Sequence, residues 1–124
     1  VGCNVLGGSG MWAGVSIACV LMVAIYALGG ISGANFNPAV SVTLGICKAL
    51  GGPGLDAATV AIYSLVQCAA GVTAGMCYSA LFSDNINLGP AKGFRSDQAG
   101  TCELLYTLML CFVVLNVAAA KKNA

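Results

Sequence analysis

Long uncharged runs are the feature of this chain that most restricts how it can fold. The first charged residue is Lys48, and no charged residue lies between Asp56 and Asp84. Glu103 is the single charged residue between Gln98 and Lys121. Hydrophobic residues make up 59% of the chain and charged residues 7%, whereas soluble domains carry about a quarter charged residues. The sequence therefore predicts an integral, multi-pass membrane protein whose solvent is the lipid bilayer.

The lengths of these runs predict the helices. A membrane-spanning helix needs about 20 mainly apolar residues. The opening segment is too short to cross and has no initiator Met, so we expect it to be the end of an earlier span and the chain to be incomplete at its N-terminus. The predicted fold is an all-α membrane domain over residues 1–124, with spans at about 11–30, 57–82 and 99–120 and a shorter half-helix at about 37–50.

Several function classes have little support in the sequence. The net charge is +1, which does not indicate binding to nucleic acid. There is no histidine, and no pair of cysteines has metal-ligand spacing, so we expect neither a metal site nor a cofactor. The chain has four side-chain carboxylates: Asp56, Asp84, Asp97 and Glu103. With so few acid–base groups, an enzyme is not expected.

A polar break follows the first complete apolar run. Residues 31–36 read Ile-Ser-Gly-Ala-Asn-Phe, and Asn-Pro-Ala-Val follows at 37–40. Asn37 is a favoured N-cap, and Pro38 suits the first helical position because it has no N–H to leave unsatisfied. In hydrocarbon each unpaired backbone group costs several kcal/mol, on the order of 4 or more, so such a break must face protein or a water-filled cavity. The pattern predicts a re-entrant half-helix whose positive N-terminal end lies within the bilayer.

With these residues in view, the chain resembles the aquaporins, or major intrinsic proteins. The ten-residue core at 31–40 carries the resemblance, and Tyr63, Gln67 and Glu103 follow in the family's order. The resemblance implies six spans and two half-helices arranged as inverted repeats, assembled as homotetramers. This chain would supply the end of span one, spans two to four and the first half-helix, about half of that fold.

The family's function is passive passage of water or small uncharged solutes. By resemblance, the Asn37 side chain donates a hydrogen bond to the solute at the pore centre, and Glu103 holds loop backbone in place. We expect Gln67 to be an interhelical hydrogen-bonding residue rather than a solute ligand. The remaining expected pore-lining residues are Pro38 and Ala39, the loop residues Gly33, Ala34, Asn35 and Phe36 with their carbonyl acceptors, and Ile17 at the narrow region.

Two positions depart from the family's usual pattern. Asn35 stands where the family most often has histidine, although both side chains form hydrogen bonds. Ile17 replaces the aromatic ring typical of strict water channels, which makes the constriction more apolar and favours a small uncharged solute beyond water.

Two explanations of the incomplete pore remain open. The chain can be a fragment of a polypeptide of about twice its length, as an inverted repeat requires. Alternatively, it can be a native short form that does not transport and that packs as a structural subunit among neighbours in a larger membrane complex.

Overall fold

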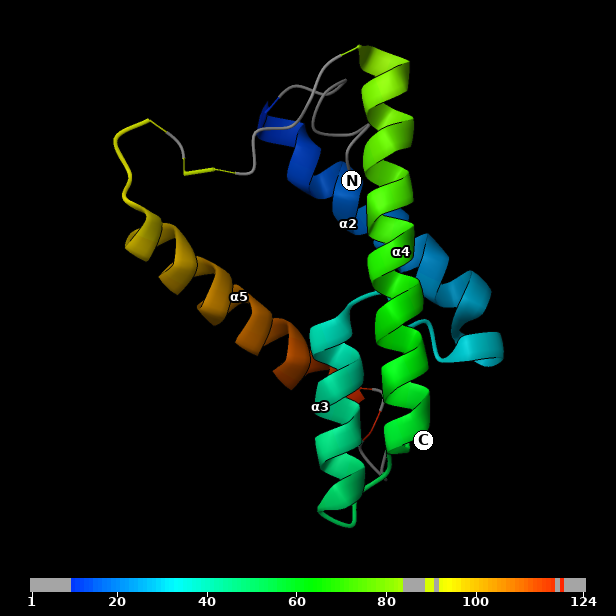
Figure 1. Ribbon diagram of the computed structural model, residues 1–124. Helices are drawn as coiled ribbons and strands as arrows, with labels where there is room; N and C mark the ends of the chain where they lie inside the picture. The colour runs from blue at the N-terminus through cyan, green and yellow to red at the C-terminus, as the bar shows by residue number, and fades with distance from the viewer. Residues whose placement is uncertain (1–9, 84–88, 91, 118, 120–124) are drawn as a thin grey trace. The chain divides into compact units, whose positions relative to one another are not determined.

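The computed structural model describes residues 10–83, 89–90, 92–117 and 119. Residues 1–9, which we expected to end an earlier span, lie outside this part. The described residues form α-helices joined by loops, with no strand among them (Figure 1). In chain order the helices are α2 (Gly10–Ser32), α3 (Pro38–Ala49), α4 (Ala57–Phe82) and α5 (Ser96–Val117).

The three long helices have apolar, outward-facing surfaces. The most apolar 18-residue stretch has a mean hydropathy of 2.2 in Trp12–Ser32, 1.5 in Ala57–Phe82 and 1.7 in Ser96–Val117, and each helix is long and apolar enough to cross a membrane. None of the residues of α4 is buried. Because lipid tails are as apolar as leucine, such exposure is unfavourable in water but not in a bilayer.

The chain divides into two units, which we describe separately. The first comprises residues 1–36 and 67–87, and the second comprises residues 37–66 and 88–124. In the second unit α3 packs against the C-terminal part of α5 (Figure 1). The buried residues of this contact are Val40, Leu44, Cys111 and Ala119, and partly buried side chains from Leu55 and Val114 surround them.

A Schellman motif ends α3. The Gly51 N–H donates to the Lys48 carbonyl (3.0 Å), and the Gly52 N–H donates to the Cys47 carbonyl (2.9 Å). Gly51 has a φ of +86°, which glycine adopts without strain. The chain then returns so closely along α3 that a Cβ on Gly54 would lie 2.0 Å from the Leu44 carbonyl oxygen. The short connection to α4 therefore depends on glycine for both conformation and space.

Asp56 caps the start of α4. Its carboxylate accepts hydrogen bonds from the Thr59 backbone N–H (3.1 Å) and from the Thr59 hydroxyl (2.8 Å). The hydroxyl bond, followed by the backbone bond, holds the pKa of Asp56 below its ordinary value of 3.8, since both favour the ionised form. The carboxylate also compensates the positive end of the helix dipole.

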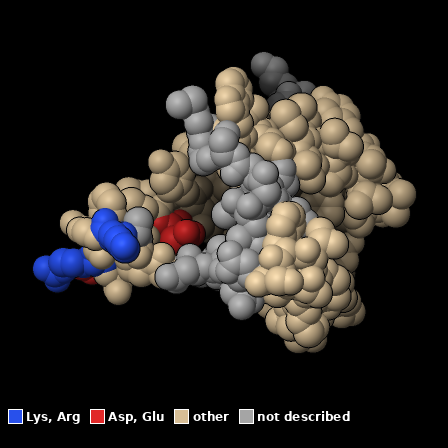
Figure 2. Space-filling model, turned by 90° about the horizontal axis from the view of Figure 1, so that it is seen from above, with Lys and Arg blue, Asp and Glu red and all other residues tan. Residues whose placement is uncertain are grey.

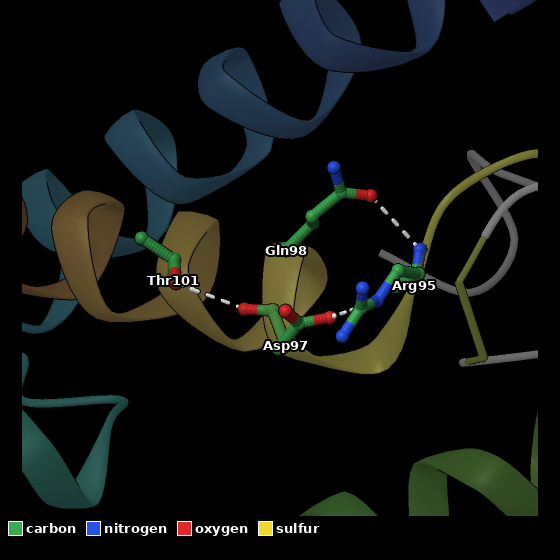
Figure 3. A network of polar contacts seen from close by, with 4 residues as sticks. All are labelled: Arg95, Asp97, Gln98 and Thr101. Atoms are coloured by element: carbon green, nitrogen blue, oxygen red, sulfur yellow. Dashed lines mark hydrogen bonds and ion pairs between the residues drawn. The ribbon is translucent and has the colours of Figure 1, made fainter.

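The start of α5 is fixed by a polar network outside the apolar run (Figure 3). The Gln98 side-chain oxygen accepts from the Arg95 N–H (3.0 Å), which is half of a capping box, and the Arg95 Nε donates to Asp97 (3.0 Å). The Thr101 hydroxyl donates to the Asp97 carbonyl at 2.8 Å. We expected a span from about 99; the helix itself begins at Ser96 because Gln98 reaches back to satisfy a free N–H.

Candidate pore loop and half-helix

Two consecutive left-handed residues turn the chain away from the end of α2. The Gly33 N–H donates to the Gly29 carbonyl at 3.0 Å, and the next conformations are left-handed, with φ of 74° at Gly33 and 51° at Ala34. For a residue with a Cβ this conformation costs about 1–2 kcal/mol. The Ala34 N–H donates to the Ser32 hydroxyl at 3.3 Å, and Ala34 is buried. Local hydrogen bonding and burial thus accompany a strained backbone.

The Asn35 carbonyl is held by a hydrogen bond, and the Asn35 side chain lies close to Gly33. Its backbone oxygen accepts a hydrogen bond of 2.5 Å from Nε2 of Gln67, which lies on α4 and is 32 residues away in the sequence. Its side-chain Nδ2 lies over Gly33, where an added Cβ would be 3.3 Å from it. Gly33 is therefore favoured at this position both by its positive φ and by the limited space beside the Asn35 amide.

Asn37 is the N-cap of α3. Its backbone is extended, with φ −138° and ψ 127°, and its Oδ1 accepts a hydrogen bond of 2.9 Å from the Ala39 N–H. Pro38 occupies the first helical turn, where its ring fixes φ and no N–H is left over. Since the amide oxygen is used in capping, Nδ2 is the end of the Asn37 side chain that remains to donate outward.

Hydroxyl groups stabilise the first turns of α3. Ser41 is fully buried, and its backbone N–H donates to the Asn37 carbonyl at 3.1 Å. The Ser41 hydroxyl approaches the same carbonyl at 3.4 Å, and the Thr43 hydroxyl donates to the Ala39 carbonyl at 2.8 Å. No role for Ser41 or Ser32 was predicted from the sequence. The signal was available in their spacing, because serine commonly bonds to backbone two or four residues away.

The loop at residues 33–37 and helix α3 carry no charge before the last turn of α3. Lys48 lies in that last turn, at the opposite end of the helix from Asn37. Figure 2 shows one face of the molecule on which uncharged residues predominate. Among the described residues, no group of three or more potential ligands could hold a metal ion. The main electrostatic feature near Asn37 is therefore the positive end of the α3 dipole, formed by oriented backbone groups.

Comparison with known proteins decides the family. The family model for major intrinsic proteins matches residues 4–124. The chain belongs to this family. The aquaporin AqpM of Methanothermobacter thermautotrophicus is 31% identical to it, over 98% of this chain and 51% of the relative. The probable aquaporin NIP4-2 of Arabidopsis thaliana is 32% identical, over 93% of this chain and 41% of the relative. No solved structure gives a significant match.

Family membership confirms the predicted class of fold. The described helices form a partial aquaporin-like membrane fold, and the protein is an integral, multi-pass membrane protein. The chain spans about half the length of the curated relatives named above. A second probable aquaporin AqpM, from Archaeoglobus fulgidus, is 30% identical and is covered over 51% of its own length.

The structure of this major intrinsic protein brings together some of the predicted site residues. Gly33 to Ala39 form one continuous loop and helix start, and Gln67 is bonded to that loop. Ile17 lies half-buried on α2, and Phe36 is exposed. Glu103 is exposed on α5, and its side chain makes no hydrogen bond or ion pair with another residue in the described ranges. The pore-lining role of Ile17 and the loop-holding role of Glu103 stay predictions.

Proposed function

We propose that the chain forms part of the wall of a passive channel for water and small uncharged solutes. The observation that carries this proposal is the orientation of the Asn37 amide. Its oxygen is engaged by the Ala39 N–H at 2.9 Å, so its nitrogen is left to donate to a solute oxygen. The likeness to aquaporins, which cover about twice the length of this chain, supports the same function.

The backbone next to Asn37 supplies acceptors. The residues from Gly33 to Phe36 are not helical, so their carbonyls have no partners of the i to i−4 kind. Water molecules that pass in single file lose hydrogen bonds to other water molecules. They can donate hydrogen bonds to these carbonyls and accept one from the Asn37 amide. This alternation of donor and acceptor replaces solvation without binding any one molecule tightly, which conduction requires.

The electrostatics favour neutral solutes. The N-terminus of α3 presents a partial positive charge, equivalent to about half an elementary charge, and no acidic residue occupies the first turn of the helix. Such half-helix ends repel protons and cations in aquaporin-type pores. Ile17 would add an apolar constriction that admits small uncharged solutes beyond water. In this proposal the working form is a homotetramer in a lipid bilayer.

An osmotic swelling experiment on proteoliposomes tests the proposal. Asn37→Asp keeps a residue that caps helices as well as asparagine does, but it removes the Nδ2 donor and adds a negative charge. We expect water permeability to fall by up to about tenfold, the factor that corresponds to one lost hydrogen bond. Pro38→Leu should have the milder effect, because proline at this position mainly presets the geometry.

A matched control tests whether the effect depends on the position of the substitution rather than on the chemical change itself. Asn116→Asp makes the same chemical change on α5, where the Asn116 amide donates to the Phe112 carbonyl at 2.7 Å, and it should leave permeability near the unsubstituted level. Swelling of the unsubstituted protein no faster than empty liposomes would refute the channel and favour the structural subunit. A greater loss in Pro38→Leu than in Asn37→Asp would show that the break serves the fold only.

A further inference from the structure

The bond between Gln67 and the Asn35 carbonyl connects the middle of a long apolar helix to the non-helical loop. Nε2 lies 2.5 Å from the oxygen, and the two residues belong to the same structural unit. Gln67 is half-buried, whereas its neighbours Val66 and Cys68 are exposed. A polar side chain inside an apolar span is energetically costly unless it is bonded, so this contact is favoured by both partners.

The carbonyl that Gln67 holds follows a strained turn. Gly33 and Ala34 are both left-handed, and Ala34 carries a Cβ in a conformation that is rarely adopted outside glycine. On one side of Ala34 the Ser32 hydroxyl accepts its N–H at 3.3 Å. On the other side Gln67 binds the next carbonyl. Such backbone persists only where the surrounding structure holds it, and these two bonds act on either side of the strained residue.

We propose that Gln67 is the positioning residue of the loop: it fixes the direction of the Asn35 carbonyl and so sets the permeability of the passage. This inference rests on the proposed function. The bond uses one of the two acceptor sites of the Asn35 oxygen and leaves the second for a passing solute. It also fixes the peptide plane between Asn35 and Phe36, which directly precedes the capping residue Asn37.

Without this bond the Asn35 peptide can rotate and the left-handed turn can relax. The orientation of the Asn35 acceptor would then vary from molecule to molecule, and a passing solute would no longer meet it in a fixed direction. Passage of water would slow, although α4 itself would keep its backbone hydrogen bonds. The role differs from that of a solute ligand, because the Gln67 donor is occupied by the protein's own backbone.

The Asn35 carbonyl can be observed directly in the whole protein. Asn35–Phe36 is the only Asn-Phe pair in the sequence, so carbonyl-¹³C asparagine combined with ¹⁵N phenylalanine marks this one peptide bond for nuclear magnetic resonance. We expect Gln67→Met, which keeps the length of the side chain but removes the donor, to shift the Asn35 carbonyl resonance upfield. In the same preparation, water permeability should fall by about two- to tenfold, as loss of one hydrogen bond implies.

Two further variants sharpen the comparison. Gln67→Asn keeps the amide but withdraws it by one methylene, so it should reproduce both effects; it also serves as the test should Gln67→Met fail to fold. Thr73→Val removes a different side-chain bond from the same helix, in which the Thr73 hydroxyl donates to the Ala69 carbonyl at 2.9 Å. That control should leave the resonance and the permeability unchanged.

The outcomes separate this inference from the proposed function. An unchanged carbonyl resonance in both Gln67 variants would overturn the bond itself, whether or not the protein conducts. A shifted resonance with unchanged permeability, in a protein that conducts, would overturn the positioning role. If the unsubstituted protein does not conduct, the channel proposal and the effect of Gln67 on permeability both fail, while the resonance still reports on the bond.

Discussion

Replacing Gly54 with alanine should strongly destabilise the connection between α3 and α4. A Cβ at this position would lie 2.0 Å from the Leu44 carbonyl oxygen and 3.0 Å from its carbon. Ordinary van der Waals contact begins at about 3.4 Å. To reach that distance from 2.0 Å, the loop would have to move away from Leu44 by about 1.4 Å. The obstacle is backbone, which cannot rotate away as a flexible side chain can.

The cost follows from what the withdrawal would break. The bonds from Gly51 to Lys48 and from Gly52 to Cys47, at 3.0 and 2.9 Å, end α3 and lie in the segment that must move. Each contributes about 1 kcal/mol to stability, and forcing extra volume into a close contact adds about 1–3 kcal/mol. We therefore expect Gly54→Ala to lower the free energy of unfolding by about 3–5 kcal/mol.

Unfolding in detergent micelles, followed by circular dichroism, measures this free energy. Gly51→Ala is the matched control: a Cβ there meets nothing within 4 Å, but φ is +86°, so its cost is conformational strain of about 1–2 kcal/mol alone. Asparagine tolerates left-handed backbone better, and Gly51→Asn should cost less than Gly51→Ala. If Gly54→Ala is no more destabilising than Gly51→Ala, close approach to Leu44 is not what requires glycine.

Three other predictions follow from the second unit. The folded-state pKa of Asp56 is lowered, so its contribution to stability is present above the ordinary value of 3.8 and is lost as pH falls through the folded pKa. Asp56→Asn should abolish that acid dependence in an unfolding titration. Gln98→Ala removes the cap of α5, so it should speed hydrogen exchange in the first turn of that helix and lower stability by about 1 kcal/mol. Arg95→Ala should lower stability by about 0.5 kcal/mol or less, because its ion pair is exposed. In the same unfolding assay, Leu44→Ala should lower stability by about 2–3 kcal/mol. Ile46 is exposed on the same helix, and Ile46→Ala should lower stability by about 1 kcal/mol or less. Equal effects of the two substitutions would refute the core contact with α5.

The sequence was sufficient wherever the information is local. Three runs with at most one charge each predicted long apolar helices, and the structure has three such helices, since the preference of a segment for lipid depends on its own hydropathy and length. The start of α3 was equally readable, because Asn37 and Pro38 satisfy the cap through atoms only two residues apart. Resemblance at residues 31–40 also identified the family correctly.

Some local signals were harder to recognise. The beginning of α5 depends on Gln98 bonding to the Arg95 N–H, which extends the helix beyond the hydropathic run. The left-handed conformation of Ala34 could not be read from its residue type, because alanine ordinarily favours helix and its φ here depends on surrounding contacts.

The sequence by itself determined the solvent, the order of the helices and the position of the break. Tertiary structure decided how the loop in that break is held, because Gln67 bonds to the Asn35 carbonyl from 32 residues away. It also decided that residue 54 must be glycine, because there is no space for a Cβ beside the Leu44 carbonyl. The physical reason is the range of the interactions. Hydropathy and capping act within a few neighbouring residues, whereas a hydrogen bond or a steric limit between distant residues exists only after the chain has brought them together.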